Sequence, residues 1–98
     1  MNKTKYEIHY TKKFKKQYKK VVKQNKDLKK LRYIVETLSN GNSLEKKYKD
    51  HSLIDNKNFN ECRECHIEPD WLLVYKYTSD KLILLLVETG SHSELFKK

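Results

Sequence analysis

The apolar positions in the first forty residues change from a two-residue period to a helical one. Tyr6, Ile8 and Tyr10 alternate with polar residues, which predicts a short strand. After Thr11 the apolar residues return every three or four positions, and lysines fill most of the others. The apolar residues of this stretch are Phe14, Tyr18, Val21 and Val22. The pattern predicts a helix with Thr11 as its N-cap.

A second helix is predicted from about Lys26 to Ser39. Its inner stripe consists of Leu28, Leu31, Ile34, Val35 and Leu38. Gly41 supplies a stop, because glycine adopts the left-handed conformation at little cost. Residues 42–58 are polar with few apolar anchors, so we expect an irregular connection, and loops of this length in small domains are usually functional or mobile.

The second half of the chain predicts three strands. They are Phe59–Ile67, Trp71–Tyr77 and Lys81–Val87, with short polar turns between them that favour antiparallel neighbours. A short tail ending in Leu95 and Phe96 follows. The order β-α-α-β-β-β predicts an α+β fold in which two N-terminal helices pack on one face of a mostly antiparallel, four-stranded sheet and leave the other face open. At 98 residues we expect one domain, residues 1–98.

Positive charge is concentrated in one half of the chain. The net charge is +9, and residues 1–49 carry 16 basic and 4 acidic side chains. A basic face on a small domain is typical of a polyanion binder, and lysines suit phosphates as point charges. The alternative is a lysine-rich helix surface that is merely solvated.

Two further patterns bound the class of protein. The longest apolar run, Leu82–Val87, is far shorter than the roughly 20 residues of a membrane span, and the basic N-terminus has no apolar stretch behind it. We therefore expect a cytoplasmic protein without membrane contact. Cys62 and Cys65 form a C-x-x-C without a second metal-binding pair, and on a strand they would face opposite ways. We predict packing roles for both, and no metal or cofactor.

Three histidines and a carboxylate lie at predicted loops and strand ends. His51 is in the long loop, His66 ends one strand, Asp70 precedes the next, and His92 follows the last strand. Each alone is explained more simply as a polar turn residue. Because tight turns bring strand ends together, the four residues are expected to converge, in an arrangement that suits acid–base chemistry. His9, on the first strand, is expected to face solvent.

The basic body and these titratable groups together favour cleavage of RNA through its own 2′-hydroxyl. One group removes the 2′ proton, a cation stabilises the phosphoryl charge, and an acid protonates the leaving 5′ oxygen. Trp71 and Phe96 are candidates for stacking on unpaired bases, with core packing as the alternative for Trp71.

Three blocks of sequence resemble the YafQ group of bacterial toxins, in the RelE/ParE superfamily. They are YKDHSL (48–53), RECHIEPDWLLVYKY (63–77) and TGSHSELF (89–96). The resemblance implies a RelE-like fold and a ribosome-dependent endoribonuclease, an mRNA interferase that cuts mRNA in the ribosomal A site without a metal. It also implies a cognate antitoxin of the DinJ/RelB type and a toxin–antitoxin hetero-oligomer.

The resemblance also implies roles for individual residues. The catalytic set is His51, His66, Asp70 and His92. His92 and Asp70 are expected to be the acid–base pair, in an order the sequence leaves open, while the other two histidines orient or neutralise the phosphate. The substrate-binding set is Lys49, Arg63, Trp71 and Phe96. Lysines of the first helix are expected to grip ribosomal RNA: Lys12, Lys13, Lys16, Lys19, Lys20 and Lys23.

One position departs from the family pattern. Glu88 stands where relatives commonly carry an arginine that can stabilise the phosphoryl charge. Either Arg63, a lysine or protonated histidines supply the cation, or activity is weakened. Two rival hypotheses therefore stay open: a ParE-like toxin that acts on DNA gyrase, and a catalytically weakened RNA-binding homologue.

Overall fold

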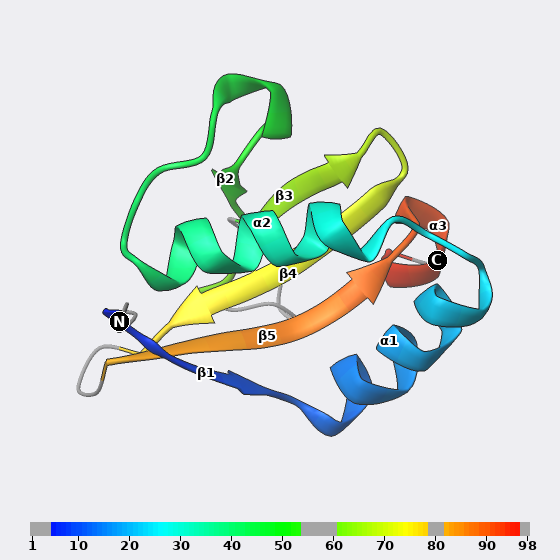
Figure 1. Ribbon diagram of the computed structural model, residues 1–98, viewed down its shortest axis with the longest axis horizontal. Coiled ribbons are helices and arrows are strands. Elements are labelled where there is room, and N and C mark those ends of the chain that lie inside the picture. Colours follow the sequence, from blue (N-terminus) through cyan, green and yellow to red (C-terminus); the bar gives the residue numbers. More distant parts are fainter. Residues whose placement is uncertain (1–4, 54–60, 79–81, 97–98) are drawn as a thin grey trace.

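The computed structural model describes residues 5–53, 61–78 and 82–96 and shows two helices packed on one face of a mixed sheet (Figure 1). The elements are β1 (Glu7–Tyr10), α1 (Lys12–Lys23), α2 (Leu28–Ser39), the 3₁₀ helix η1 (Lys46–Tyr48), β2 (His51–Ser52), β3 (Arg63–Glu68), β4 (Trp71–Tyr77), β5 (Ile83–Gly90) and α3 (His92–Leu95). The strand order is β1-β5-β4-β3-β2. The predicted α+β fold with two N-terminal helices on a mostly antiparallel sheet is confirmed.

The sheet differs from the prediction in two details. It has five strands in the described residues, because β2 adds a two-residue edge strand from within the expected loop. The first strand, β1, pairs in parallel with β5, whereas all other neighbours are antiparallel. The start of the strand predicted at Phe59 lies outside the described residues, and β3 begins at Arg63.

Side-chain caps set where the two long helices begin. The Oγ1 atom of Thr11 accepts from the backbone N–H of Phe14, so α1 begins where predicted. The Oδ1 atom of Asp27 accepts from the backbone N–H of Lys29, and α2 therefore begins at Leu28. Gly41, with φ of 78°, follows the end of α2 as expected.

The main core lies between the sheet and the helices. Its buried members are Phe14, Val21, Leu31, Ile34, Leu38, Cys65, Ile67, Trp71, Leu73, Tyr75, Leu84 and Leu86. Val22, predicted on the inner stripe of α1, is 43% exposed, because α1 lies at the edge of the sheet and buries a narrower stripe.

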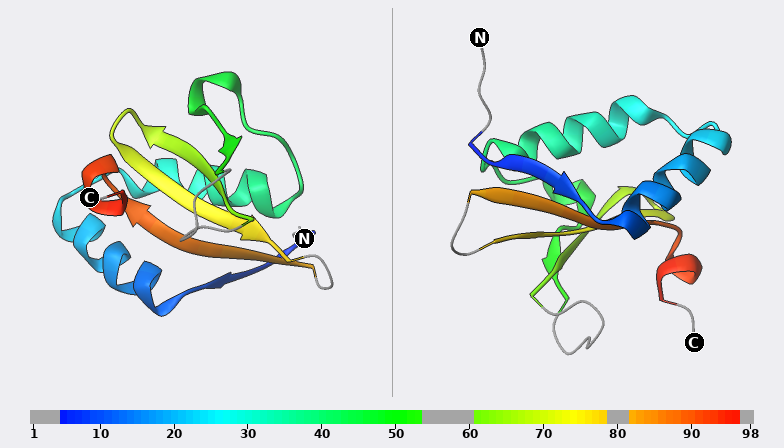
Figure 2. Two further views of the ribbon diagram at one scale, coloured as in Figure 1. Left: turned by 180° about the vertical axis from the view of Figure 1, so that it is seen from behind. Right: turned by 90° about the horizontal axis from the view of Figure 1, so that it is seen from below.

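The opposite face of the sheet is not open as predicted. Leu72 and Val74 point to this face and are fully buried, packed with Cys62 and Leu95. The short helix α3 lies on this side of the sheet, away from α2 (Figure 2). The central strand β4 is apolar on both faces, so both faces of the sheet must be covered by other parts of the chain at this strand.

The two cysteines are free thiols on opposite faces, as predicted. Cys65 belongs to the core beneath the helices and Cys62 to the second cluster. Burial raises the pKa of both thiols. Among the described residues, no helix combines the length and apolar character needed to cross a bilayer.

Candidate active site

The turn between β3 and β4 holds two of the predicted catalytic residues. Pairing of these strands shifts register between His66 and Glu68, and such bulges re-aim neighbouring side chains. The Nδ1 atom of His66 lies 3.2 Å from the carbonyl oxygen of Pro69. The imidazole of His66 is thereby fixed against the turn that carries Asp70.

Asp70 and His92 come together across the ends of two strands. The Oδ1 atom of Asp70 accepts from the backbone N–H of His92 at 3.0 Å. His92 is the first residue of α3, whose start is fixed by a capping box between Ser91 and Glu94. The contact is made by the backbone of His92, and both residues are exposed, so their side chains lie where a substrate can reach them.

Helix α3 is also tied to α1. The side chain of Lys20 forms an ion pair and hydrogen bond with Glu94. The hydrogen bond from Lys20, followed by the backbone N–H of Ser91, lowers the pKa of Glu94 to about 2. The helix that carries His92 is therefore held at its start by its own cap and at its side by a lysine of α1.

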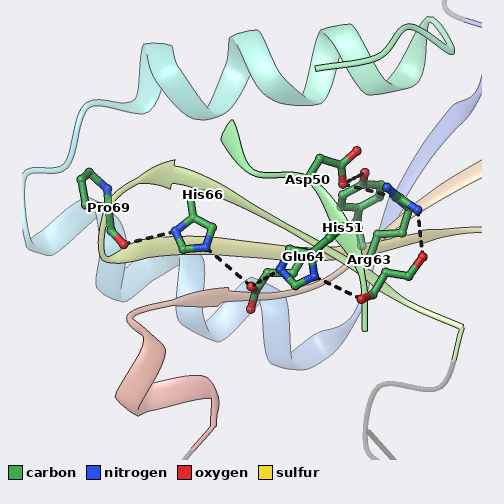
Figure 3. Close-up of polar contacts among 8 residues, drawn as sticks. Asp50, His51, Arg63, Glu64, His66 and Pro69 are labelled. Atoms are coloured by element: carbon green, nitrogen blue, oxygen red, sulfur yellow. Dashed lines mark hydrogen bonds and ion pairs between the residues drawn. The ribbon is translucent and has the colours of Figure 1, made fainter. Parts of the chain in front are cut away.

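Glu64 joins the other two histidines into one cluster (Figure 3). Its Oε1 atom lies 3.0 Å from Nε2 of His51 and 3.7 Å from Nε2 of His66. Glu64 is only 5% exposed, whereas the histidine rings reach solvent. Sequence reasoning missed this residue, although Glu64 and His66 are two apart on a strand and must share a face.

Asp50 anchors the segment that leads into β2. It accepts from the hydroxyl of Tyr75 at 2.6 Å and from Nε of Arg63 at 3.2 Å. Burial, then the hydrogen bond to Asp50, raises the pKa of Tyr75. A second hydrogen bond joins Arg63 to the Oγ atom of Ser52 at 2.9 Å. Arg63 therefore braces the loop next to His51, which does not favour its expected role as the phosphate-binding cation.

A cleft of about 340 Å³ lies beside His66 and is rich in lysine. Its lining includes Lys30, Lys47 and Lys49. Lys30 pairs with Glu68 at 3.0 Å, and that hydrogen bond raises the pKa of Lys30. Lys49, predicted to bind substrate, thus lies at the same cleft as His66. Lys47, which lines the same cleft, was not predicted.

The structure contradicts the base-stacking role expected for Trp71. Its side chain is completely buried, and Nε1 donates to Oγ1 of Thr89 at 3.0 Å. The alternation along β4 directs this ring under the helices rather than toward the strand ends. Phe96 is partly exposed, and its ring centroid lies 5.1 Å from that of His92.

The carboxylate of Glu88 contacts two side chains of α1. It accepts from Nε2 of Gln17 at 3.0 Å and lies 3.4 Å from Nζ of Lys13, and it is 8% exposed. A carboxylate that is paired and nearly buried adds little repulsion at the strand ends. The predicted ribosome-binding lysines are all exposed, but Lys13 and Lys20 are engaged with Glu88 and Glu94.

Comparisons with known proteins agree on one family. The profile of a family described as bacterial toxin of type II toxin-antitoxin system, YafQ, matches residues 6–97. An mRNA interferase toxin YafQ from Escherichia coli (strain B / BL21-DE3) is 42% identical over 91 residues, which are 92% of this chain and 95% of the relative.

Solved structures show the same fold. The E. coli DinJ-YafQ toxin-antitoxin complex contains a chain 38% identical to this one, with a TM-score of 0.82 over 94% of this chain and 98% of that chain. A metal-bound toxin from Helicobacter pylori is 45% identical, with a TM-score of 0.85 over 93% and 99% of the two chains.

Proposed function

The chain belongs to the YafQ family of toxins from type II toxin-antitoxin systems, and we propose that it cuts mRNA at the surface formed by His66, Asp70 and His92. It is an mRNA interferase, and therefore an endoribonuclease. The observation that supports the site assignment is the 3.0 Å hydrogen bond from the backbone N–H of His92 to Asp70, which places the two residues next to each other. The site of action is the cytoplasm, where mRNA is bound to the ribosome.

The reaction is a transfer of the phosphoryl group within the RNA. One member of the Asp70–His92 pair takes the proton of the 2′-hydroxyl, and the 2′ oxygen forms a bond to phosphorus. The bond from phosphorus to the 5′ oxygen breaks, and the other member gives that oxygen a proton. The products are a 2′,3′-cyclic phosphate and a 5′-hydroxyl, and no further reactant is consumed.

The negative charge that develops on the phosphoryl oxygens needs a cation, because no arginine occupies position 88. Lys49 and Lys47 line the cleft beside His66, and their positive charge supports a role in holding the phosphate there. His51 and His66 orient the same group. Phe96, with its ring against His92, supplies a surface on which the neighbouring base can stack.

The partners are the ribosome with its mRNA and a cognate antitoxin. The exposed lysines of α1 suit ribosomal phosphates. An apolar groove of about 450 Å³ lies between β1 and the helices, lined by Ile8, Tyr10, Phe14 and Tyr18 and edged by Lys15 and Lys19. This combination suits an acidic, amphipathic antitoxin segment, as a DinJ-type partner would supply.

The test is cleavage of a defined mRNA on ribosomes, followed by toe-printing. The double substitution Asp70→Ala and His92→Ala should abolish the codon-positioned cuts. Asp70→Asn keeps an oxygen that accepts from the N–H of His92 but cannot take a proton, so it should lower the rate by about 10²–10⁴-fold. His9→Gln, on the exposed strand β1, is the matched control and should cut normally. Unchanged cuts in the double variant would refute the site.

The gyrase-directed alternative is not favoured, because the relatives are named mRNA interferases. Intact mRNA together with stalled supercoiling would support it. The weakened-homologue hypothesis depended on Glu88, whose charge is paired with Lys13. A rate of cleavage close to background for the unaltered chain would revive it.

A further inference from the structure

Thr89 lies inside the molecule although its side chain is polar. The residue is 1% exposed, and its hydroxyl makes two hydrogen bonds. Oγ1 accepts from Nε1 of Trp71 at 3.0 Å and donates to the carbonyl oxygen of Leu72 at 2.7 Å. A buried hydroxyl is costly unless it is hydrogen-bonded, and here it is used both as a donor and as an acceptor.

These two hydrogen bonds join the start of β4 to the end of β5. Trp71 is the residue next to Asp70, and Thr89 is three residues before His92. Pairing between β4 and β5 ends one residue further on, at Gly90. The start of β4, the end of β5 and α3 lie together at one end of the sheet (Figure 1). The hydroxyl of Thr89 therefore adds two contacts where the strand pairing stops and the contact between Asp70 and His92 begins.

Helix α1 holds the other side of Thr89. Strand β1 pairs with β5 only as far as Leu86, and the chain then turns into α1. From there a side chain takes the place of a strand: Oε1 of Gln17 accepts from the backbone N–H of Thr89 at 2.9 Å. The Nε2 atom of Gln17 donates to Glu88 at 3.0 Å. Thr89 is thus fixed to α1 by its backbone and to β4 by its side chain.

The chain between Thr89 and His92 is short and constrained. Only two residues separate them, Gly90 and Ser91. A Cβ atom at Gly90 would lie 2.9 Å from Oε1 of Glu94, so α3 packs closely against the end of β5. Ser91 forms the capping box with Glu94. A displacement of Thr89 is therefore passed on to His92.

We propose that Thr89 is a positioning residue for the acid–base pair of Asp70 and His92, through its hydroxyl on one side and Gln17 on the other. This inference rests on the proposed function, because it concerns the same pair. Thr89 and Trp71 are buried and do not reach the RNA, so they act only on the geometry of the pair. A misplacement of reacting groups by about 1 Å can cost about 10²-fold in rate, so the effect belongs in kcat rather than in KM.

The kinetic test compares Thr89→Val with Thr89→Ser in ribosome-dependent cleavage of a defined mRNA. Thr89→Val removes the hydroxyl and leaves the N–H of Trp71 without its acceptor. Its kcat should fall roughly 10–100-fold, while KM stays within about twofold of the original. Thr89→Ser keeps the hydroxyl, so its kcat should stay within about threefold. Thr37→Val, which deletes another hydroxyl bonded to a carbonyl oxygen, on α2, is the matched control and should cut normally.

Trp71→Phe tests the same hydrogen bond from its other partner. It removes the indole N–H and leaves no buried donor unpaired, because the hydroxyl of Thr89 still donates to Leu72. Its kcat should also fall. In the double variant of Thr89→Val and Trp71→Phe, kcat should be no lower than in Thr89→Val alone, because the hydrogen bond is already lost. Fully additive losses would overturn the proposal. If Thr89→Val does not fold, an unchanged kcat in Trp71→Phe would overturn it.

A measurement on the pair itself separates this inference from the proposed function. The amide proton of His92 is hydrogen-bonded to the carboxylate of Asp70, and its NMR resonance should move upfield in Thr89→Val but not in Thr89→Ser. An unmoved resonance, or full kcat in Thr89→Val, would overturn the role of Thr89. If the double alanine variant of Asp70 and His92 still cut mRNA, the proposed function would fail, whereas a moved resonance would still show that Thr89 sets their contact.

Discussion

Lys49 combines an unfavourable backbone conformation with a useful side chain. It ends η1 with φ of 50° and ψ of 42°, the left-handed region that costs a non-glycine residue about 1 kcal/mol or more. This turn brings Asp50 to Tyr75 and aligns His51 with Glu64. Glycine would suit the backbone better, but only the lysine gives charge to the cleft beside His66.

Lys49→Gly therefore separates stability from function. We expect the free energy of unfolding to stay within about 1 kcal/mol of the original, because relieved strain offsets the added chain entropy. Cleavage should fall about tenfold, the equivalent of one lost charge-assisted hydrogen bond of about 1.4 kcal/mol. Urea denaturation and cleavage kinetics measure the two effects. Lys29→Gly, on the exposed side of α2, is the control: it should lose stability without losing activity.

Trp71 and Phe96 provide a second contrast between residues. Trp71→Leu should lower the free energy of unfolding by about 2–4 kcal/mol and leave the KM of the folded enzyme for mRNA unchanged, because the ring is buried. Phe96→Leu should raise KM roughly tenfold through the loss of stacking worth about 1–3 kcal/mol. A higher KM in Trp71→Leu, measured well below its melting temperature, would contradict its assignment to the core.

The limits of sequence reasoning are clearest at single residues. His92 and Asp70 were predictable as neighbours because tight turns bring strand ends together. Glu64 was not singled out, because a carboxylate in a strand has an ordinary solvent-facing explanation until its partners from β2 are known. Trp71 was ambiguous because an aromatic residue at a strand start serves a core or a base equally well, and only burial decides.

At the scale of elements, the position of His92 depends on how α3 is held. Helix α3 has four residues, too few to be stable alone, so it is held by its capping box, the buried side chain of Leu95 and the Lys20–Glu94 ion pair. Lys20 was predicted to bind ribosomal RNA, but the structure engages it within the molecule.

Substitutions at Lys20 and Glu94 test this dependence. Glu94→Gln keeps a capping side chain and loses the ion pair, whereas Glu94→Ala loses both, so cleavage should decrease in that order. Lys20→Gln should resemble Glu94→Gln. Cleavage is measured at saturating ribosomes, and Lys16→Gln, on the same helix and without an ion pair among the described residues, is the control that should cleave normally under that condition. Equal losses in Lys16→Gln and Lys20→Gln at saturating ribosomes would contradict the role of the Lys20–Glu94 ion pair.

The same ion pair gives a pH dependence. The pKa of Glu94 is about 2 in the folded chain and 4.5 without its partners, so the ionised form is the one that folding favours. Its stabilising effect is complete above about pH 4.5 and is lost as the pH falls toward 2. Urea denaturation from pH 6 to pH 2.5 should show an acid loss of stability that is smaller in Glu94→Gln. Identical pH profiles of the free energy of unfolding in Glu94→Gln and the unaltered chain would refute the stabilising role of the Glu94 carboxylate.

Elements were predictable where local signals agreed. Thr11 as a cap and the lysine-filled helical period gave the start of α1, and the apolar run of β4 gave both of its ends. The segment that forms η1 and β2 has no such period, because its order comes from contacts made by Asp50 and Arg63 with the rest of the sheet. The covered second face of the sheet was missed because the tail that covers it is too short to show a pattern.

At the scale of the whole molecule, the exposed lysines of α1 and the proposed catalytic residues lie on different elements. Of the six lysines of α1 that were predicted to bind ribosomal RNA, four are exposed and form no ion pair among the described residues: Lys12, Lys16, Lys19 and Lys23. The cleavage residues lie at the β3–β4 turn and α3. This separation allows ribosome association and cleavage to be changed independently.

Replacing those four lysines with glutamine should weaken ribosome association and leave the chemical step intact. Each phosphate contact adds about 0.7–0.9 to the slope of log K against log salt, so the slope should decrease by about 3. Binding measured across a series of KCl concentrations gives this slope, and a saturating-ribosome assay gives the cleavage rate. An unaltered slope would remove α1 from the ribosome-binding surface.

Because β2 has only two residues, the part of the site that carries His51 is locally less stable than the part that carries His66. His51 lies at the outer edge of the sheet on a strand that pairs over two residues, whereas His66 lies on β3, which pairs with the central strand β4 over most of its length. The last few residues of an edge can detach in brief local openings that leave the interior intact, so amide hydrogens of β2 should exchange with deuterium long before those of β4. A chain in that open form would still be compact and would still bind its antitoxin. Its active site, however, would lack the imidazole of His51.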